Sequence, residues 1–197
     1  MSGGKTFGRI LERYERGFRQ ATECSCGPAS LILVSEALGL PAKEESACYD
    51  PNFGKWLRVA EFGTRGMAIH ELALAAELIF GSEVEVLLRR AFPENLQQFV
   101  SDLKESRDRD GSAMILNFAQ DHVMGRAFQD QGYPHHSPVA GFDEKRAEVL
   151  IADVDSEVAT AKLVPVSTVF EAMAFMNPAF GVPRGWLLIR KRSKGAG

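Results

Sequence analysis

The sequence predicts an α+β fold, in which a helical first half is followed by a half made mainly of antiparallel strands. Up to about residue 106 the apolar residues recur mostly at helical spacing, whereas short β-type runs separated by turn residues follow from residue 113. Such segregation of helices from strands is typical of α+β proteins. We therefore expect one domain over residues 1–197, with a helical part over about 5–106, a sheet part over about 112–192, and the active site in the cleft between them.

The first half is expected to contain four helices, one irregular stretch and one strand. Apolar residues recur at helical spacing in the first helix, and Pro28 suits the first turn of the second. Thr64 is placed to cap the third helix, and Pro93 opens the fourth. The predicted elements are helices over 5–19, 27–38, 66–80 and 93–106, an irregular stretch over 40–63 and a strand over 82–88.

The second half is expected to hold four strands and one helix. Each strand is a short run of β-type residues bounded by turn residues. Thr168 and Glu171 form a capping-box pair at the start of the helix. The predicted elements are strands over 113–118, 137–142, 148–154 and 186–190 and a helix over 169–176.

Composition excludes several classes of function. The chain has 197 residues, 45% hydrophobic residues and a formal net charge of −3, which gives no general reason to expect nucleic acid or an anionic membrane as a partner. No apolar run approaches the roughly 20 residues of a membrane helix, and the N-terminus lacks the apolar core of a signal peptide. Three cysteines, an odd number, do not suggest a disulfide scaffold. A reducing cytoplasm is the expected location.

The most informative segment runs from Gln20 to Ser30 and leads into an apolar helix. It places Cys26 at the expected N-terminus of that helix, where the backbone dipole and free amide donors favour the thiolate. The thiolate is the nucleophilic form of cysteine, so this position suits covalent acyl chemistry. Gln20 lies six residues upstream, and its side chain could donate to a tetrahedral oxyanion together with the backbone N–H of Cys26.

A histidine pair is expected to meet a carboxylate in the second half. The segment from Pro134 to Phe142, which includes His135 and His136, leads through a turn into the segment from Ala147 to Asp153, and the two are expected to form a hairpin. A carboxylate opposite the pair could hold one imidazole in a fixed tautomer, as a catalytic triad requires. The register decides which histidine shares a face with Asp153. A turn of even length would pair Asp153 with His136 and one of odd length with His135, and spacing alone leaves both open.

Together these motifs resemble the phytochelatin synthase family, within the wider papain-like thiol enzymes. That family carries the patterns Gln-x5-Cys-Gly-x-Ala-Ser-Leu, His-Phe-Ser-Pro-x-x-Gly-Tyr and Ile-Leu-Asp-Val, followed by Glu-Ala-Met. The corresponding residues occur in the same order over about residues 20–175. They are Gln20, Cys26, Gly27, Ala29, Ser30, Leu31, His135, His136, Ser137, Pro138, Gly141, Phe142, Ile151, Ala152, Asp153, Val154 and Glu171 to Met173.

The resemblance implies a papain-like fold and a role for each matching residue. Cys26 would be the nucleophile, His135 the general base and acid, Asp153 the residue that orients it and Gln20 the oxyanion donor. His136 would take the family's aromatic position, as a packing or rim residue. The implied reaction removes glycine from glutathione and leaves γ-glutamylcysteine on the cysteine, for transfer to water or a second glutathione. No cofactor and no protein-bound metal are expected, although metal thiolates could serve as substrates.

Two departures from the plant enzymes resemble the short prokaryotic members, in which hydrolysis dominates. Asp153 and Val154 are followed by Asp155, Ser156 and Glu157, whereas the plant enzymes carry an arginine two residues beyond the valine. This acidic stretch should weaken the binding of an anionic tripeptide. We also expect no counterpart of the long cysteine-rich C-terminal extension that the eukaryotic members carry.

Two other functions stay open. A cysteine peptidase or an amide-transferring enzyme acting on another peptide would use the same triad, and Asp155 and Glu157 favour it. A non-catalytic thiol or metal-binding module would use Cys24, Cys26 and the histidine pair as ligands, although structural zinc sites more often space their cysteines further apart. Cys24 could also be a resolving thiol. Neither a role for Cys48 nor the oligomeric state follows from the sequence.

Overall fold

A six-stranded antiparallel sheet forms the centre of the computed structural model, which describes residues 4–126, 132 and 134–193. A separate two-stranded ribbon precedes the last strand of the chain. The six strands, in the order in which they lie side by side, are β1 Val84–Arg90, β8 Gly185–Lys191, β2 Ser112–Ala119, β3 Pro134–Asp143, β4 Glu148–Ile151 and β5 Lys162–Pro165, and the ribbon is β6 Met176–Asn177 with β7 Val182–Pro183.

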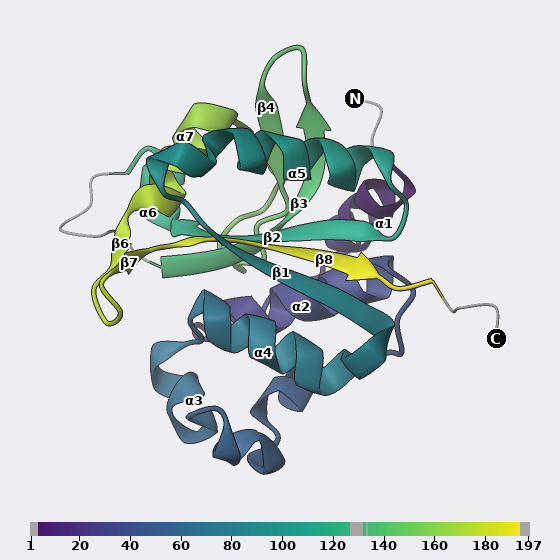
Figure 1. Ribbon diagram of the computed structural model, residues 1–197, viewed down its shortest axis with the longest axis vertical. Coiled ribbons are helices and arrows are strands. Elements are labelled where there is room, and N and C mark those ends of the chain that lie inside the picture. Colours follow the sequence, from purple (N-terminus) through teal and green to yellow (C-terminus); the bar gives the residue numbers. More distant parts are fainter. Residues whose placement is uncertain (1–3, 127–131, 133, 194–197) are drawn as a thin grey trace.

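Helices cover both faces of this sheet. They are α1 Lys5–Glu15, α2 Cys26–Ala37, α3 Phe62–Arg65, α4 Ile69–Phe80, α5 Leu96–Asp108, α6 Gln120–Met124 and α7 Val166–Ala174, with short 3₁₀ turns η1 Glu45–Tyr49, η2 Pro51–Lys55, η3 Val59–Glu61, η4 Gly81–Glu83 and η5 Pro93–Asn95. Figure 1 shows α2 and α4 on one side of the sheet and α5 and α7 on the other. The sheet is therefore the middle layer of the fold.

Two apolar cores fill the spaces between these layers. Successive residues of a strand point to opposite faces, so each strand contributes to both cores. In β2, Ala113 and Ile115 join the core with α2 and α4, whereas Met114, Leu116 and Phe118 join the core with α5 and α7. Burial on both faces explains why this strand is a nearly continuous apolar run in the sequence.

The predicted α+β class and the antiparallel character of the sheet are confirmed. The helix predicted over 66–80 begins only at Ile69, and Thr64 lies inside α3 instead of capping α4. Gly66, with a φ of 68°, separates the two helices. The start of α4 is stabilised by Glu71, whose carboxylate accepts a hydrogen bond from the backbone N–H of Ala68 at 2.7 Å.

Other differences concern element ends. The first helix stops at Glu15, because Gly17 adopts a φ of 92°. The helix predicted over 169–176 begins at Val166, so the expected capping pair Thr168 and Glu171 lies within its first two turns. β1, which belongs to the first half of the chain, extends the sheet at its edge. The predicted elements did not include α6 or the strands β5, β6 and β7.

The register between β3 and β4 shifts by one residue inside the strand pair. The turn between them has four residues, 144–147. Next to the turn, Asp143 pairs with Glu148 and Gly141 with Leu150, whereas beyond Ala140 the partners change. The shifted pairs are Val139 with Ile151 and, through a hydrogen bond of 3.0 Å from the Ala152 N–H to the Pro138 carbonyl, Pro138 with Ala152.

This bulge decides which histidine meets Asp153. With an even turn and no bulge, Asp153 would lie opposite Pro138, on the face of His136. The extra residue brings Asp153 opposite Ser137, on the face of His135. The register that the sequence left open is thus set by a bulge within the strand and not by the length of the turn.

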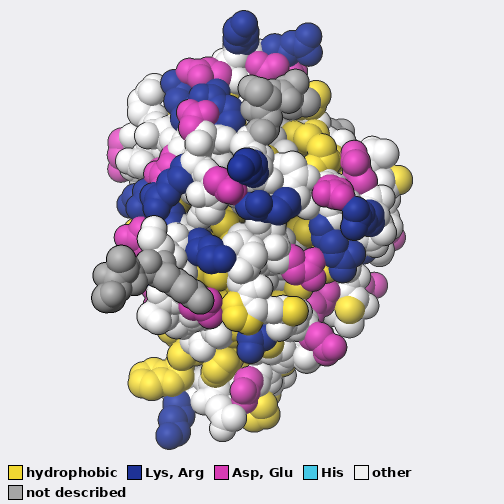
Figure 2. Space-filling view, turned by 90° about the vertical axis from the view of Figure 1, so that its right-hand side faces the viewer, with side chains coloured by type: hydrophobic (Ala, Val, Ile, Leu, Met, Phe, Trp, Pro, Cys, Tyr) yellow, Lys and Arg dark blue, Asp and Glu magenta, His cyan; other side chains and the backbone are white. Residues whose placement is uncertain are grey.

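Charged side chains of both signs are interspersed over the face shown in Figure 2. This pattern agrees with the small net charge of −3. Among the helices that the structure describes, none is both long enough and apolar enough to span a bilayer.

Candidate active site

Cys26 is the first residue of α2, a helix that is buried along almost its whole length. Pro28 fits this first turn because it has no N–H to leave unpaired. The first N–H groups of a helix have no acceptor within it, and they carry the positive end of the helix dipole. The thiol is 7% exposed and sits where these groups favour negative charge. The structure thus places Cys26 at the N-terminus of a helix, as the sequence predicts.

His135 and Asp153 form a buried pair. His135 Nε2 lies 2.6 Å from Asp153 Oδ1, and both residues are almost fully buried. Three further groups hold the carboxylate: the Ser137 hydroxyl donates to Oδ1 at 3.2 Å, the Asp155 backbone N–H donates to Oδ1 at 3.1 Å, and Gln120 Nε2 donates to Oδ2 at 3.3 Å. Gln120 also donates to the Asp155 side chain at 2.9 Å. The carboxylate is therefore fixed by several hydrogen bonds and can in turn fix the imidazole.

Hydrogen bonds and charge dominate the electrostatics of the thiol. Burial alone would raise the pKa of Cys26, but hydrogen bonds to His135 and His136 and the charge of these rings lower that pKa to about 5. Burial alone would likewise lower the pKa of His135, yet hydrogen bonds to Asp153 and Cys26 raise it to about 10. Between these values the site holds a thiolate beside an imidazolium, which is the reactive form of a cysteine nucleophile.

His136 also contacts the thiol. Its Nδ1 lies 3.7 Å from Cys26 Sγ, within hydrogen-bonding distance for sulfur. The ring also lies next to Gly27, where a Cβ would be in ordinary van der Waals contact with the same Nδ1, at 3.7 Å. The sequence had assigned His136 to packing or to the rim of the site, whereas the structure places it directly against the sulfur.

Gln20 lies at the entrance to the site. Its backbone N–H donates to the Val154 carbonyl at 2.8 Å, which ties this segment to the residue after Asp153. Its Nε2 makes only a long bond of 3.4 Å to the Glu23 carbonyl, and its buried Oε1 has no partner among the described residues. The amide is therefore weakly held and is free to rotate toward a bound substrate.

Two pockets flank the site. The first, of about 540 Å³, is lined by Gln20 and His135 and by acidic side chains, among them Glu23, Asp155 and Glu157. The second, of about 210 Å³, is lined mainly by apolar groups and by a buried cation; its lining includes Met67, Phe180, Asn117, Pro134, Arg65 and Arg184. Asn117 is the cross-strand partner of His136, which places the second pocket beside the histidine pair.

Arg184 is an unusual member of the second pocket. It is 1% exposed, and its guanidinium donates to the carbonyls of Phe175 and Gly132 at 3.3 and 3.1 Å. Its Nε has no hydrogen-bond partner among the residues that the structure describes. Burial lowers the pKa of Arg184 to about 10. A buried cation without an anion is costly, so this pocket is suited to an anionic group.

Sequence reasoning missed Gln120, Ser137 and Arg184. Ser137 lies within the recognised histidine motif, so its position in that motif could have pointed to a role. Gln120 begins α6, which the sequence did not predict, and Arg184 is the single residue between β7 and β8. Gln120 and Arg184 stand out only because the fold buries their polar groups beside the site, which the sequence does not show.

Other candidates lie apart from this arrangement. All three cysteines are free, and burial raises the pKa of Cys48 to about 12. Among the residues that the structure describes, no three His, Cys, Asp or Glu side chains are grouped so as to hold a metal ion.

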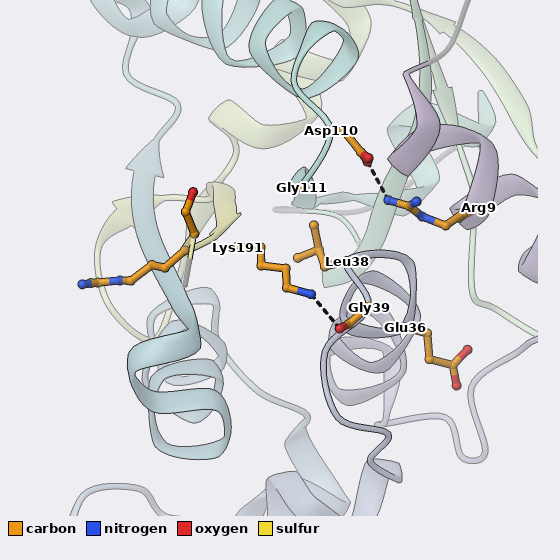
Figure 3. Close-up of a pocket in the computed structure, with 9 residues that line it drawn as sticks. Arg9, Glu36, Leu38, Gly39, Asp110, Gly111 and Lys191 are labelled. Atoms are coloured by element: carbon orange, nitrogen blue, oxygen red, sulfur yellow. Dashed lines mark hydrogen bonds and ion pairs between the residues drawn. The ribbon is translucent and has the colours of Figure 1, made fainter. Parts of the chain in front are cut away.

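A larger pocket of about 580 Å³ lies at the other end of β2. It is bordered by the Arg9–Asp110 ion pair at 2.6 Å and by the Lys191 amine, which donates to the Gly39 carbonyl at 2.8 Å (Figure 3). Its charged groups thus already have partners within the protein.

The fold, with a cysteine at the N-terminus of a helix that packs on the central sheet, is that of the papain-like class of cysteine-dependent enzymes. A family profile described as phytochelatin synthase matches residues 4–186, and the chain therefore belongs to that family. The resemblance noted in the sequence is confirmed. No match was found among curated proteins.

Two solved structures are similar to this chain. A C39-like peptidase from Bacillus anthracis superposes with a TM-score of 0.57 at 14% identity, over 90% of this chain and 95% of that chain. The N-terminal peptidase C39-like domain of a toxin secretion ATP-binding protein from Vibrio parahaemolyticus gives a TM-score of 0.46 at 14% identity, over 85% of this chain and 97% of that chain. At such identity, the first likeness concerns the fold and not the substrate.

Proposed function

We propose that this protein removes glycine from glutathione by acyl transfer through Cys26, with His135 as general base and acid, Asp153 as its orienting group and Gln20 as an oxyanion donor. The observation that carries this proposal is the acidic thiol beside an imidazole that Asp153 holds at 2.6 Å. The same constellation, found on unrelated folds, performs acyl transfer.

In the proposed reaction the Cys26 thiolate attacks the carbonyl carbon of the Cys–Gly bond. The resulting oxyanion is stabilised by the Cys26 backbone N–H and the Gln20 amide. The C–N bond breaks as His135 gives its proton to the glycine nitrogen, which leaves a thioester of γ-glutamylcysteine on Cys26. Water, or the amine of a second glutathione, then attacks the thioester and passes a proton to His135.

Family membership and the pocket beside the histidine pair support a small substrate with a carboxylate. The buried Arg184 would meet that carboxylate, because it has hydrogen-bonding capacity and positive charge left unused. In glutathione the γ-glutamyl group, on the acyl side of the scissile bond, carries such a carboxylate. We further propose a reducing cytoplasm as the location, which the three free thiols support.

A second candidate is a cysteine peptidase or amide-transferring enzyme acting on another peptide. The observation that favours it is the acidic lining of the pocket beside His135, where Asp155 and Glu157 would repel the carboxylate of a glycine leaving group. Its triad would be the same, so only the substrate separates the two candidates.

The deciding experiment is intact-protein mass spectrometry after brief mixing with glutathione, with and without cadmium, alongside an assay of free glycine. The proposal expects a mass gain of one γ-glutamylcysteinyl group together with glycine release. Both should vanish in Cys26→Ser and persist in Cys24→Ser, a matched control two residues away.

The other possible results separate the candidates. No adduct and no glycine, with Cys26 still alkylated rapidly near pH 6, would exclude glutathione and favour the second candidate. Glycine release that survives in Cys26→Ser would exclude the thiol mechanism altogether.

A further inference from the structure

The proposed acyl transfer uses one imidazole, yet the sulfur is in contact with two. His136 is 2% exposed, and its Nδ1 lies 3.7 Å from Cys26 Sγ. Its other ring nitrogen, Nε2, is buried and has no hydrogen-bond partner among the described residues. His135, in contrast, uses its Nε2 for Asp153. Only His135 is therefore built into a carboxylate–imidazole pair.

This asymmetry fixes what His136 can do for the sulfur. A neutral imidazole has one N–H donor and one acceptor nitrogen. With the proton on Nδ1, the ring donates to the thiolate, and only a lone pair is left without a partner at Nε2. With the proton on Nε2, a buried N–H has no acceptor and the Nδ1 lone pair faces a negative sulfur. The first tautomer satisfies the donor and is the stable one beside a thiolate.

We propose that His136 is a positioning residue that donates a hydrogen bond from Nδ1 to the Cys26 sulfur and holds the thiolate in the resting site, separately from the proton transfer through His135. This inference rests on the proposed role of Cys26 as the nucleophile, but not on the identity of the substrate. A charge-assisted bond of this kind stabilises the thiolate before substrate binds and weakens as the sulfur loses its charge on attack.

The ring of His136 lies next to the first turn of α2 and is buried. A Cβ at Gly27 would lie 3.7 Å from its Nδ1, and Asn117 pairs with His136 across the strands. The titratable groups around the sulfur come from β3, from η1 and from the segments before α2 and after β4; they are His135, His136, Glu45, Cys48, Tyr49, Cys24 and Asp153. Of these groups, the two histidines are the ones that favour the thiolate through direct hydrogen bonds.

The test measures the thiol itself, without any substrate. The rate of alkylation of Cys26 by iodoacetamide is followed against pH by mass spectrometry, in the wild type and in three variants. Asn places an N–H donor close to the position of Nδ1, Leu has nearly the same shape without the donor, and Phe keeps the ring volume without the donor. We expect the pH at which the alkylation rate is half-maximal, here called the midpoint, to rise by about one to two pH units in His136→Leu and His136→Phe. In His136→Asn the midpoint should stay near the wild-type value.

Each result decides the matter. Equal midpoints in all four proteins, or equal shifts in the Asn and Leu variants, would overturn the donor role in favour of simple packing. A further comparison uses His135→Ala alone and the double variant His135→Ala/His136→Leu. If the pH midpoint of alkylation rises in the single variant and does not rise further in the double variant, the donor role of His136 would also be overturned. Should His136→Leu unfold, the Phe variant carries the comparison, and circular dichroism checks each protein. Failure of the glutathione experiment would leave these alkylation midpoints unchanged, so the two proposals fail separately.

Discussion

Cys26 and Cys48 show that burial alone does not make a cysteine reactive. Both thiols are buried, yet the pKa of Cys48 rises to about 12 whereas that of Cys26 falls to about 5. Burial acts in the same direction on both, because it removes water from the thiolate. The difference comes from the hydrogen bonds that His135 and His136 make to one sulfur and not to the other. The reactivity of the Cys26 thiol thus depends on the residues that contact it.

Replacing Asp153 should change the charge state of the imidazole. A neighbouring anion favours the protonated ring and raises its pKa, so Asp153→Asn should lower the pKa of His135 from about 10 toward the ordinary value of about 6.5. NMR titration of the protein with labelled histidines measures this directly, and His70 on α4 is an internal control whose titration should not move. A His135 titration that is unchanged in the variant would contradict the pairing.

Arg184 gives a second prediction at the level of one side chain. If it binds the substrate carboxylate, Arg184→Met should lower kcat/KM for glutathione about 10- to 100-fold, mainly through KM, because one charge-assisted hydrogen bond is worth roughly 1.5–3 kcal/mol. Arg146→Met, at an exposed position in the β3–β4 turn, is the matched control and should leave both constants unchanged. A fall in kcat with an unaltered KM would exclude a role in binding.

Single residues show which part of the site the sequence could predict. Cys26, His135 and Asp153 follow from motifs with fixed spacing, and the structure brings all three together; their catalytic roles stay a prediction. The contact of His136 with the sulfur and the burial of Arg184 depend on the packing of distant segments. No local pattern carries that information, which is why the sequence did not predict them.

At the level of elements, β8 is the strand most constrained by its neighbours. It lies between β1 and β2, and at Gly185 the backbone of β1 comes so close that a Cβ would lie 2.0 Å from the Arg89 carbonyl oxygen. Neither strand can move away without losing its pairing in the sheet. The glycine therefore permits β1 to pack closely against β8 beside the pocket of Arg184.

Gly185→Ala should accordingly destabilise the protein by about 1–3 kcal/mol, since the added methyl group forces the two backbones apart. Urea unfolding followed by circular dichroism gives the change in the free energy of unfolding. Gly54→Ala is the control, because nothing lies within 4 Å of the added Cβ and the residue is exposed. A loss of stability no greater than that of the control would show that the strands can separate without cost.

Most elements could be predicted because their sequences carry strong periodicity or turn residues, and the errors have local causes. The start of α4 was misplaced because Gly66 interrupts what looks like one continuous helix. The strands β6 and β7 have only two residues each, too few for a pattern. The bulge at Ala140 could not be predicted, since a strand with an extra residue has nearly the same composition as one without it.

At the scale of the whole molecule, the site is assembled from the two sides of one layer interface. Cys26 belongs to the helices that pack on one face of the sheet, whereas His135 lies in β3 and Asp153 directly follows β4. The segregation of helices and strands in the sequence predicted this division correctly. What it could not predict is that the sheet lies between two helical layers, because β1 and α5 come from the first half of the chain.

A one-residue deletion within a strand ordinarily turns the residues beyond it to the opposite face of the sheet. Ala140 is an exception, because Gly141 already pairs with Leu150 and Val139 with Ile151, so its loss would leave both pairs in place. Ser137 would still lie opposite Asp153, and His135 would keep its carboxylate. A related chain one residue shorter at this point would therefore use the same histidine.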